Sequence, residues 1–188
     1  MDYYPIVRSV LDAIDAAQVT YMIVGALSAN IHGVMRATND ADIVVELADR
    51  RVSEITRHLG PEFVLDPQIA FDSVTGSYRH ILTLRNSHFK VELFRLSKDA
   101  HDLERFERRK TQFNGPLGRL ASYPTAEDVI IMKLRWAECL NRNKDKEDVR
   151  DIIAIQQESL DWSYIEGWVG KHGTQKLLNE IRATIPRQ

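Results

Sequence analysis

The chain has 188 residues, of which 44% are hydrophobic and 28% are charged. These fractions are typical of globular proteins and exclude collagen-like, low-complexity and wholly disordered chains. Lysine and arginine together number 25, and aspartate and glutamate 27, which gives a net charge of −2. Without an excess of positive charge the chain cannot hold a nucleic-acid backbone non-specifically, so any contact with RNA or DNA must be local.

The length predicts one domain with a sizeable core, or one domain with a small annex. Cys139 is the single cysteine, so no internal disulfide can form, as is usual in a reducing compartment. The first residues lack a basic region followed by a cleavage site, and the longest apolar runs are far shorter than the roughly 18 residues of a membrane span. We therefore expect a cytoplasmic protein with no membrane partner.

Hydrophobic periodicity in the first half of the chain predicts helices alternating with short strands. Pro5 falls in the first turn of the first helix, where proline is tolerated, and Gly33 follows the second helix as a usual C-cap. The predicted elements are a helix over 5–17, a strand over 21–24, a helix over 26–32, a strand over 41–46, a helix over 50–58, and two antiparallel strands over 78–84 and 89–94 that are joined by a short turn.

The second half of the chain is expected to be mostly helical. Thr125 and the acidic residues after it resemble a capping box at a helix start, and Gly115 and Gly118 favour a hairpin turn. The predicted elements are a helix within 97–110, a hairpin around 115–118, and helices over 125–140, 144–157, 161–172 and 174–185.

These elements predict an α/β (α+β) fold, with a short mixed sheet and flanking helices followed by a C-terminal helical bundle. No linker rich in serine or glycine separates the two parts. We therefore expect an α/β core over residues 1–122 and a helical region over residues 123–188 that packs on the core.

The segment from Val24 to Val45 is the most informative for chemistry. Gly25 stands where a strand turns into a helix, so backbone N–H groups and the helix N-terminus can face an anionic phosphate. Asp40 and Asp42 are two residues apart on an extended segment and therefore point to one face. Paired carboxylates next to a phosphate site are typical of Mg²⁺ bound together with a nucleotide.

Glu92 is the candidate for a third carboxylate. It is an acid inside an apolar strand, where an isolated charge costs free energy unless it is paired or bound to metal. The alternative is an edge-strand acid that faces solvent together with Lys90. For Asp40 and Asp42, the alternative is a solvated turn before a strand.

The pattern Gly25-Ala26-x-Ser28, then Arg36-x-Thr38-x-Asp40-x-Asp42, then Val91-Glu92-Leu93, resembles the DNA polymerase beta-type nucleotidyltransferase superfamily. The AbiEii-like toxin nucleotidyltransferases are the most similar subgroup, because Lys133-Leu134 and the later Asp148 match their Lys-Leu helix and Asp-rich helix. The resemblance covers roughly residues 21–153. It implies nucleotidyl transfer: two Mg²⁺ ions, or Mn²⁺, bridge the carboxylates and an NTP, a hydroxyl attacks the α-phosphorus, and pyrophosphate leaves.

The resemblance also assigns roles to individual residues. The expected metal ligands are Asp40, Asp42 and Glu92, and the catalytic set adds Lys133 and Asp148 to them. The expected nucleotide-binding residues are Gly25, Ala26, Ser28, Arg36, Thr38 and Lys133. The chain departs from the family pattern at Ala26, where a glycine or serine is usual, and at Glu92, where an aspartate is usual.

The implied function is transfer of NMP to a hydroxyl of RNA (tRNA-like) or of a protein by a toxin with a cognate antitoxin. The glutamate at position 92 keeps an alternative open, a catalytically weakened protein that binds a nucleotide or a partner. A small-molecule nucleotidyltransferase is a third possibility.

Other charged and aromatic residues favour structural roles. Lys133 has a surface position on an amphipathic helix as its alternative. Charge pairing along one helix favours solvent exposure for Asp145, Glu147 and Asp151. The arginines of 95–110 are interpreted as a solvated helix, although Arg105, Arg108 and Arg109 could contact an RNA acceptor. Packing between helices is expected for the aromatic residues Trp136, Trp162, Tyr164 and Trp168.

Overall fold

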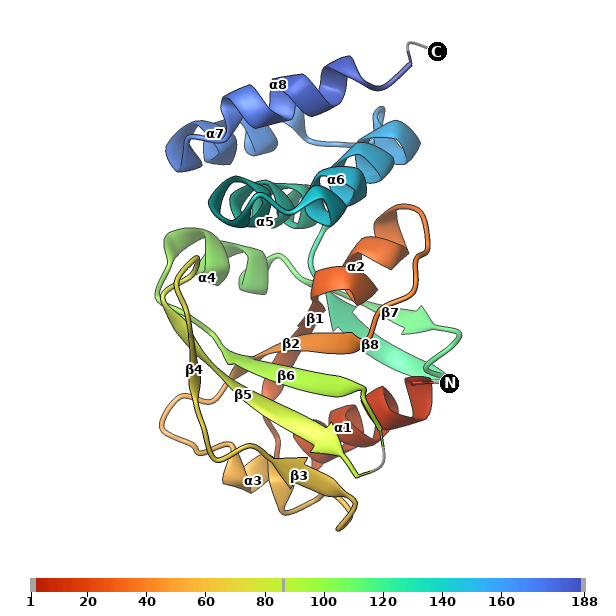
Figure 1. The fold of residues 1–188 in the computed structure, drawn as a ribbon, viewed down its shortest axis with the longest axis vertical. Coiled ribbons are helices and arrows are strands. Elements are labelled where there is room, and N and C mark those ends of the chain that lie inside the picture. Colours follow the sequence, from red (N-terminus) through yellow and green to blue (C-terminus); the bar gives the residue numbers. More distant parts are fainter. Residues whose placement is uncertain (1–2, 86, 187–188) are drawn as a thin grey trace.

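The computed structural model describes residues 3–85 and 87–186. It is an α/β structure in which a mixed sheet lies beside its helices, and the last four helices form a separate layer at one end (Figure 1). The helices are α1 (Tyr4–Ala16), α2 (Gly25–His32), α3 (Ser53–Thr56), α4 (Ala100–Glu107), α5 (Ala126–Leu140), α6 (Asn143–Gln156), α7 (Trp162–His172) and α8 (Gln175–Ala183). The strands are β1 (Thr20–Val24), β2 (Asp40–Glu46), β3 (Phe63–Leu65), β4 (Ala70–Asp72), β5 (Ser77–Leu84), β6 (Lys90–Arg95), β7 (Lys110–Asn114) and β8 (Arg119–Tyr123).

The main sheet has the order β1-β2-β6-β5-β3, and β4 also pairs with β5. The β2–β6 pairing is parallel, whereas the other pairings of this sheet are antiparallel, so the predicted mixed sheet is confirmed. The β7–β8 hairpin is a second, two-stranded sheet. Because β2 and β6 are parallel and adjacent, their residues stand side by side in the middle of the sheet.

Alternation along the strands gives the main sheet two different faces. One face presents Ile23, Ile43 and Leu93 to the main core, which α1 completes with Val7, Leu11 and other residues at helical spacing. The opposite face carries a smaller apolar cluster that includes Met22, Val44 and Phe106 of α4, and alternation along β2 places Asp42 on the same face as Val44. The second face therefore positions the site.

The C-terminal helices have a core of their own. It joins α5 and α6 to α7 and α8, and Ala29 of α2 belongs to the same buried cluster. Thr125 caps α5 by accepting a hydrogen bond from the Asp128 N–H, as the capping-box pattern predicts. The helical region therefore packs on α2, and the division at residue 122 stays a prediction.

Two expectations for residues 50–72 differ from the structure. The helix expected over 50–58 is reduced to α3, because the main-chain hydrogen bonds on either side of it join residues three apart, as in turns, from Arg50 to Leu47 and from His58 to Ile55. Strands β3 and β4 were not expected, since each has three residues and acquires its ladder by pairing with β5. The hairpin turn expected after β5 includes Asn86, which lies outside the described residues.

Within the described part of the chain, no helix has the length and apolar character to cross a membrane.

Candidate active site

The junction between β1 and α2 brings Gly25 against Asp42. Val24 is the β1 residue opposite Asp42 in the antiparallel register, so the chain turns into α2 directly beside that carboxylate. Gly25 has a φ of +64°, and a Cβ added there would lie 2.0 Å from Asp42 Oδ2. Both the backbone conformation and the close approach therefore require glycine at this position.

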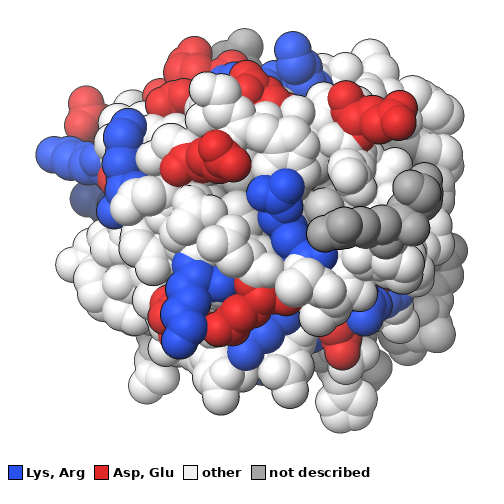
Figure 2. All heavy atoms as spheres, turned by 90° about the horizontal axis from the view of Figure 1, so that it is seen from above, with Lys and Arg blue, Asp and Glu red and all other residues white. Residues whose placement is uncertain are grey.

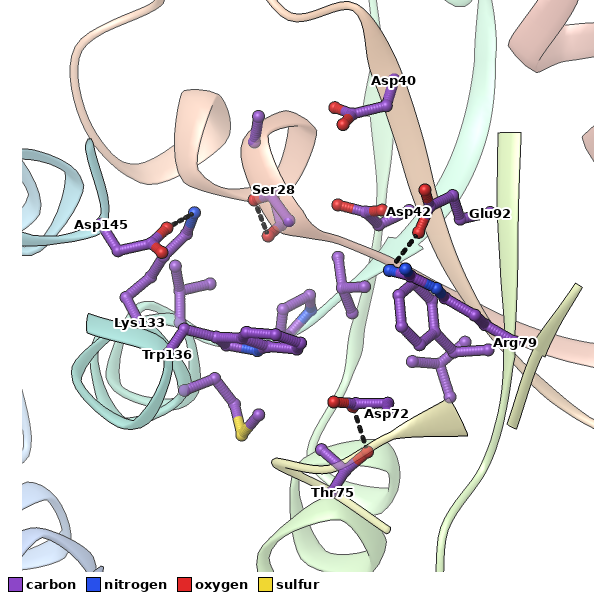
Figure 3. Close-up of a pocket in the computed structure, with 18 of the residues that line it drawn as sticks. Ser28, Asp40, Asp42, Asp72, Thr75, Arg79, Glu92, Lys133, Trp136 and Asp145 are labelled. Atoms are coloured by element: carbon purple, nitrogen blue, oxygen red, sulfur yellow. Dashed lines mark hydrogen bonds and ion pairs between the residues drawn. The ribbon is translucent and has the colours of Figure 1, made fainter. Parts of the chain in front are cut away.

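The three predicted carboxylates lie on one face of adjacent strands. Asp40 and Asp42 are alternate residues of β2, and Glu92 is the register partner of Asp42 on β6. All three line the same pocket, where Asp42 lies below Asp40 and beside Glu92 in Figure 3. Because β6 is between β2 and β5, Glu92 is on a central strand, and the edge-strand alternative is wrong.

The ionised form of Asp42 is disfavoured by its surroundings in the pocket. Burial, together with the negative charges of Asp40 and Glu92, raises the pKa of its carboxyl to about 7. The positive charges of Lys133 and Arg142 act in the opposite direction and only partly offset it. An additional cation at this position would relieve both the repulsion and the cost of burial.

The donor set fits a divalent cation chemically, because carboxylate oxygens are the ligands that Mg²⁺ prefers. Thr38 Oγ1 donates to Asp40 Oδ1 over 2.6 Å, so the second oxygen of Asp40 stays available. Among residues 3–85 and 87–186, however, no three histidine, cysteine, aspartate or glutamate side chains are grouped closely enough to hold a metal. The metal-ligand roles of Asp40, Asp42 and Glu92 therefore stay predictions.

Lys133 reaches the pocket from α5 and lies between two carboxylates of α6. Its Nζ is 2.7 Å from Asp145 Oδ1 and 2.7 Å from Asp148 Oδ2. Asp148 also accepts two hydrogen bonds from Arg36, at 2.8 and 2.9 Å. Burial acts to raise the pKa of Asp148, but these bonds and the positive charges of Arg36 and Lys133 lower it overall.

Lys133 is buried, so the surface alternative for it is wrong, as is the solvated interpretation of Asp145. Helical charge pairing predicted exposure for Asp145, yet the residue is 1% exposed and its carboxylate contacts Lys133. A spacing of twelve residues between Lys133 and Asp145 carries no signal in the sequence. The contact exists because α5 and α6 pack side by side.

The remaining expected nucleotide-binding residues lie at the α2 end of the pocket. Gly25, Ala26, Ser28 and Arg36 line it. Ser28 is buried, and its hydroxyl donates to the Gly25 carbonyl over 2.9 Å. Thr38 and Asp148 are not among the residues that line the pocket, but Thr38 contacts the lining residue Asp40 and Asp148 contacts the lining residue Lys133. These nucleotide-binding roles stay predictions.

Sequence reasoning missed other pocket residues. Arg79 of β5 donates from Nη1 to Glu92 Oε2 over 2.8 Å, and it is a charge on an otherwise partly apolar strand, the same signal that identified Glu92. Trp136, three residues after Lys133 in the chain, lines the pocket, so packing between helices is not its whole role. Arg105 is buried against Asp102 and also lines the pocket, which corrects the solvated interpretation of α4.

Known proteins share this architecture. The crystal structure of ANT(2")-Ia in complex with adenylyl-2"-tobramycin is similar with a TM-score of 0.62 and 12% identity, covering 94% of this chain and 99% of that one. An antigenic nucleotidyltransferase-like protein from Paracoccidioides brasiliensis is similar with a TM-score of 0.57 and 13% identity, covering 99% of this chain and 94% of that one. At these identities the likeness shows the fold. No curated protein matches the sequence.

Residues 7–184 match a family described as "Nucleotidyltransferase of unknown function (DUF6036)". The match spans the sheet, the pocket and the C-terminal helices, so the superfamily resemblance is confirmed at the level of nucleotidyltransferases. The chain, with its three carboxylates gathered beside Gly25, belongs to this DUF6036 family of nucleotidyltransferases.

Proposed function

We propose that the protein transfers NMP from an NTP to a hydroxyl of RNA or of a protein, in a Mg²⁺-dependent reaction. We further propose an AbiEii-like toxin role in the cytoplasm, held in check by a cognate antitoxin. The observation that carries nucleotidyl transfer is the gathering of Asp40, Asp42 and Glu92 on one sheet face, with Lys133 across the pocket from them.

In this proposal the NTP binds between the core of residues 1–122 and the helical region of residues 123–188. The start of α2 at Gly25 presents backbone N–H groups to phosphate oxygens, and Lys133 supplies a positive charge from α5. Asp145 and Asp148 orient the Lys133 ammonium.

The carboxylates divide between the metal and the acceptor. Asp40 and Asp42 would hold Mg²⁺, or Mn²⁺, with Glu92 completing the ligand set. When bound, the metal would neutralise charge that develops on the transferred phosphate. Glu92 lies beside Asp42 on the next strand and would orient the attacking hydroxyl.

The surface charge bears on how an RNA acceptor could bind. Seen from the C-terminal helices, basic and acidic side chains are interspersed on this face (Figure 2). An extended RNA backbone would find no uniform positive field there. We therefore expect RNA to be recognised at the pocket, where Arg36, Arg79, Arg105 and Arg142 are among the lining residues.

Two alternatives each have an observation in their favour. The fold likeness to ANT(2")-Ia, whose structure holds an adenylylated tobramycin, favours a small-molecule acceptor. The ion pair between Arg79 and Glu92 favours a catalytically weakened protein, because it engages the third carboxylate.

The test incubates the purified protein and Mg²⁺ with each α-³²P-labelled NTP, in parallel with total RNA, with total protein, and with tobramycin. Asp42→Asn is the site variant and Asp49→Asn, an exposed position, is the matched control. We expect label on RNA or protein with the wild type and the control, and none with Asp42→Asn. Label on tobramycin alone would show that the acceptor is a small molecule. No label on any acceptor would favour the catalytically weakened protein.

A further inference from the structure

Arg79 lines the pocket and donates to Glu92, the third carboxylate of the proposed site. We infer that its guanidinium binds an oxyanion of the acceptor, the phosphodiester that adjoins the terminal hydroxyl of an RNA, and leaves Glu92 when it does so. This inference rests on the proposed function and names the feature of the acceptor that the pocket recognises.

The contact between Arg79 and Glu92 is suited to exchange. A single 2.8 Å bond joins Nη1 to Oε2, and the side chains are 34% and 15% exposed. An ion pair at this level of exposure gains little net free energy, so an incoming anion can compete for the guanidinium. A fully buried bidentate pair would not open in this way.

The other edge of the Arg79 guanidinium is underused. Its Nε is buried and has no hydrogen-bond partner among the described residues. A buried N–H without an acceptor is unfavourable, and a planar guanidinium binds phosphate best with two parallel N–H groups. A small rotation that lets Nε and Nη2 donate together to a phosphate would satisfy this edge.

Two further carboxylates that line the pocket are already engaged. Asp102 accepts from Ser97 Oγ over 2.6 Å and from Arg105 Nε over 2.7 Å. Asp72 accepts from the hydroxyl of Thr75 and from the main-chain N–H of Val74. These acids are therefore not spare partners for Arg79, and an oxyanion from a ligand is the complementary group.

The position of Arg79 identifies which substrate supplies the oxyanion. Lys133 and Arg79 approach from opposite sides of the pocket, with Asp42 between them (Figure 3). If Lys133 and the start of α2 hold the triphosphate, Arg79 lies on the side from which the hydroxyl arrives. The last phosphodiester of an RNA adjoins its terminal hydroxyl, whereas the hydroxyl of an unmodified protein side chain has no such group.

The exchange has a consequence for Glu92. When Arg79 turns to the phosphodiester, both Glu92 oxygens become available to the metal site and to the attacking hydroxyl. Only an acceptor that carries the phosphodiester charge therefore releases Glu92 to act together with Asp40 and Asp42. Arg79 is thus a specificity-determining residue, and an acceptor without the phosphodiester leaves Glu92 engaged.

Binding calorimetry on the full chain tests this inference without relying on turnover. The protein is loaded with Mg²⁺ and the tightest-binding of the four α,β-methylene NTPs, then titrated with a diribonucleotide or with its uncharged methylphosphonate analogue. We expect the wild type to bind the charged dinucleotide about tenfold more tightly, as one charge-assisted contact would give. Arg79→Gln should bind both weakly and equally, and Arg79→Lys should retain part of the preference.

Arg85→Gln is the matched control, because Arg85 is an exposed arginine just after β5. It should behave as the wild type. Arg79→Gln should still bind the NTP analogue, which also checks its folding. A wild type that binds the two dinucleotides equally, or neither of them, overturns the inference, as does an effect of Arg79→Gln on the NTP analogue alone. Failure of the wild type to bind any NTP analogue would instead contradict the proposed function.

Discussion

Gly25 and Asp42 are packed so closely that no side chain larger than hydrogen fits between them. A Cβ on Gly25 would meet Asp42 Oδ2 at 2.0 Å, at a position where φ is +64°. The position of Asp42, which the proposed reaction requires, therefore depends on a glycine at the turn into α2.

Gly25→Ala should displace Asp42 and abolish nucleotidyl transfer. The matched control is Gly173→Ala, because Gly173 also has a positive φ, of +71°, but a Cβ there has no neighbour within 4 Å. We expect Gly173→Ala to lower the free energy of unfolding by about 1 kcal/mol and to keep activity. Gly25→Ala should cost more than that in urea unfolding. Transfer by Gly25→Ala at the wild-type rate would contradict the account.

The raised pKa of Asp42 predicts a pH-dependent stability in metal-free protein. Between the ordinary value and about 7, the folded state keeps a proton that the unfolded chain releases. Stability from this group is therefore present at low pH and lost as the pH rises through about 7. Asp42→Asn removes this loss, so its unfolding free energy relative to wild type should increase by more than about 1.4 kcal/mol from about pH 4 to about pH 8.

Urea denaturation in EDTA across this pH range measures the difference. The control Asp49→Asn should show no such trend, since Asp49 is exposed. A difference between Asp42→Asn and wild type that is constant with pH would show that Asp42 titrates normally.

Lys133→Met should both destabilise the protein and abolish transfer. It removes the cation that lies between Asp145 and Asp148 and leaves buried negative charge. Arg36 and Arg142 still contact these carboxylates, so the loss of stability is limited to about 2–4 kcal/mol. Adding Asp145→Asn should recover part of the stability without recovering activity. Recovery of activity in the double variant would mean that Lys133 has only a structural role.

Trp136→Ala should weaken nucleotide binding. The indole lines the pocket, and the Arg142 guanidinium carbon is 5.5 Å from the ring centroid. Stacking of a base on an aromatic ring contributes about 1–3 kcal/mol, so the Kd of an α,β-methylene NTP should rise at least about fivefold. Trp136→Phe should retain most of the affinity. Equal affinity for wild type and Trp136→Ala would place the base elsewhere.

Local signals in the sequence were enough to predict the carboxylate side of the site. A glycine at a strand-to-helix junction identified Gly25, alternation identified Asp40 and Asp42, and an acid in an apolar strand identified Glu92. Each of these signals lies within a few consecutive residues. The structure then places these residues together because β2 and β6 are adjacent and parallel.

The contacts that the sequence did not predict are those between distant elements. Asp145 has the pattern of a solvated helix and becomes buried only because α6 packs on α5 beside Lys133. Arg79 meets Glu92 through the pairing of β5 with β6. Strands as short as β3 have no periodicity to detect, and their pairing depends on β5.

The most direct test of nucleotidyl transfer follows both ends of the NTP in parallel reactions with α-³²P and γ-³²P labels, using wild type and Asp42→Asn. We expect the α label to appear on the acceptor and the γ label in pyrophosphate, and both products to disappear in Asp42→Asn. Transfer of the γ label to the acceptor, its release as inorganic phosphate, or unchanged turnover in Asp42→Asn would contradict nucleotidyl transfer at this site.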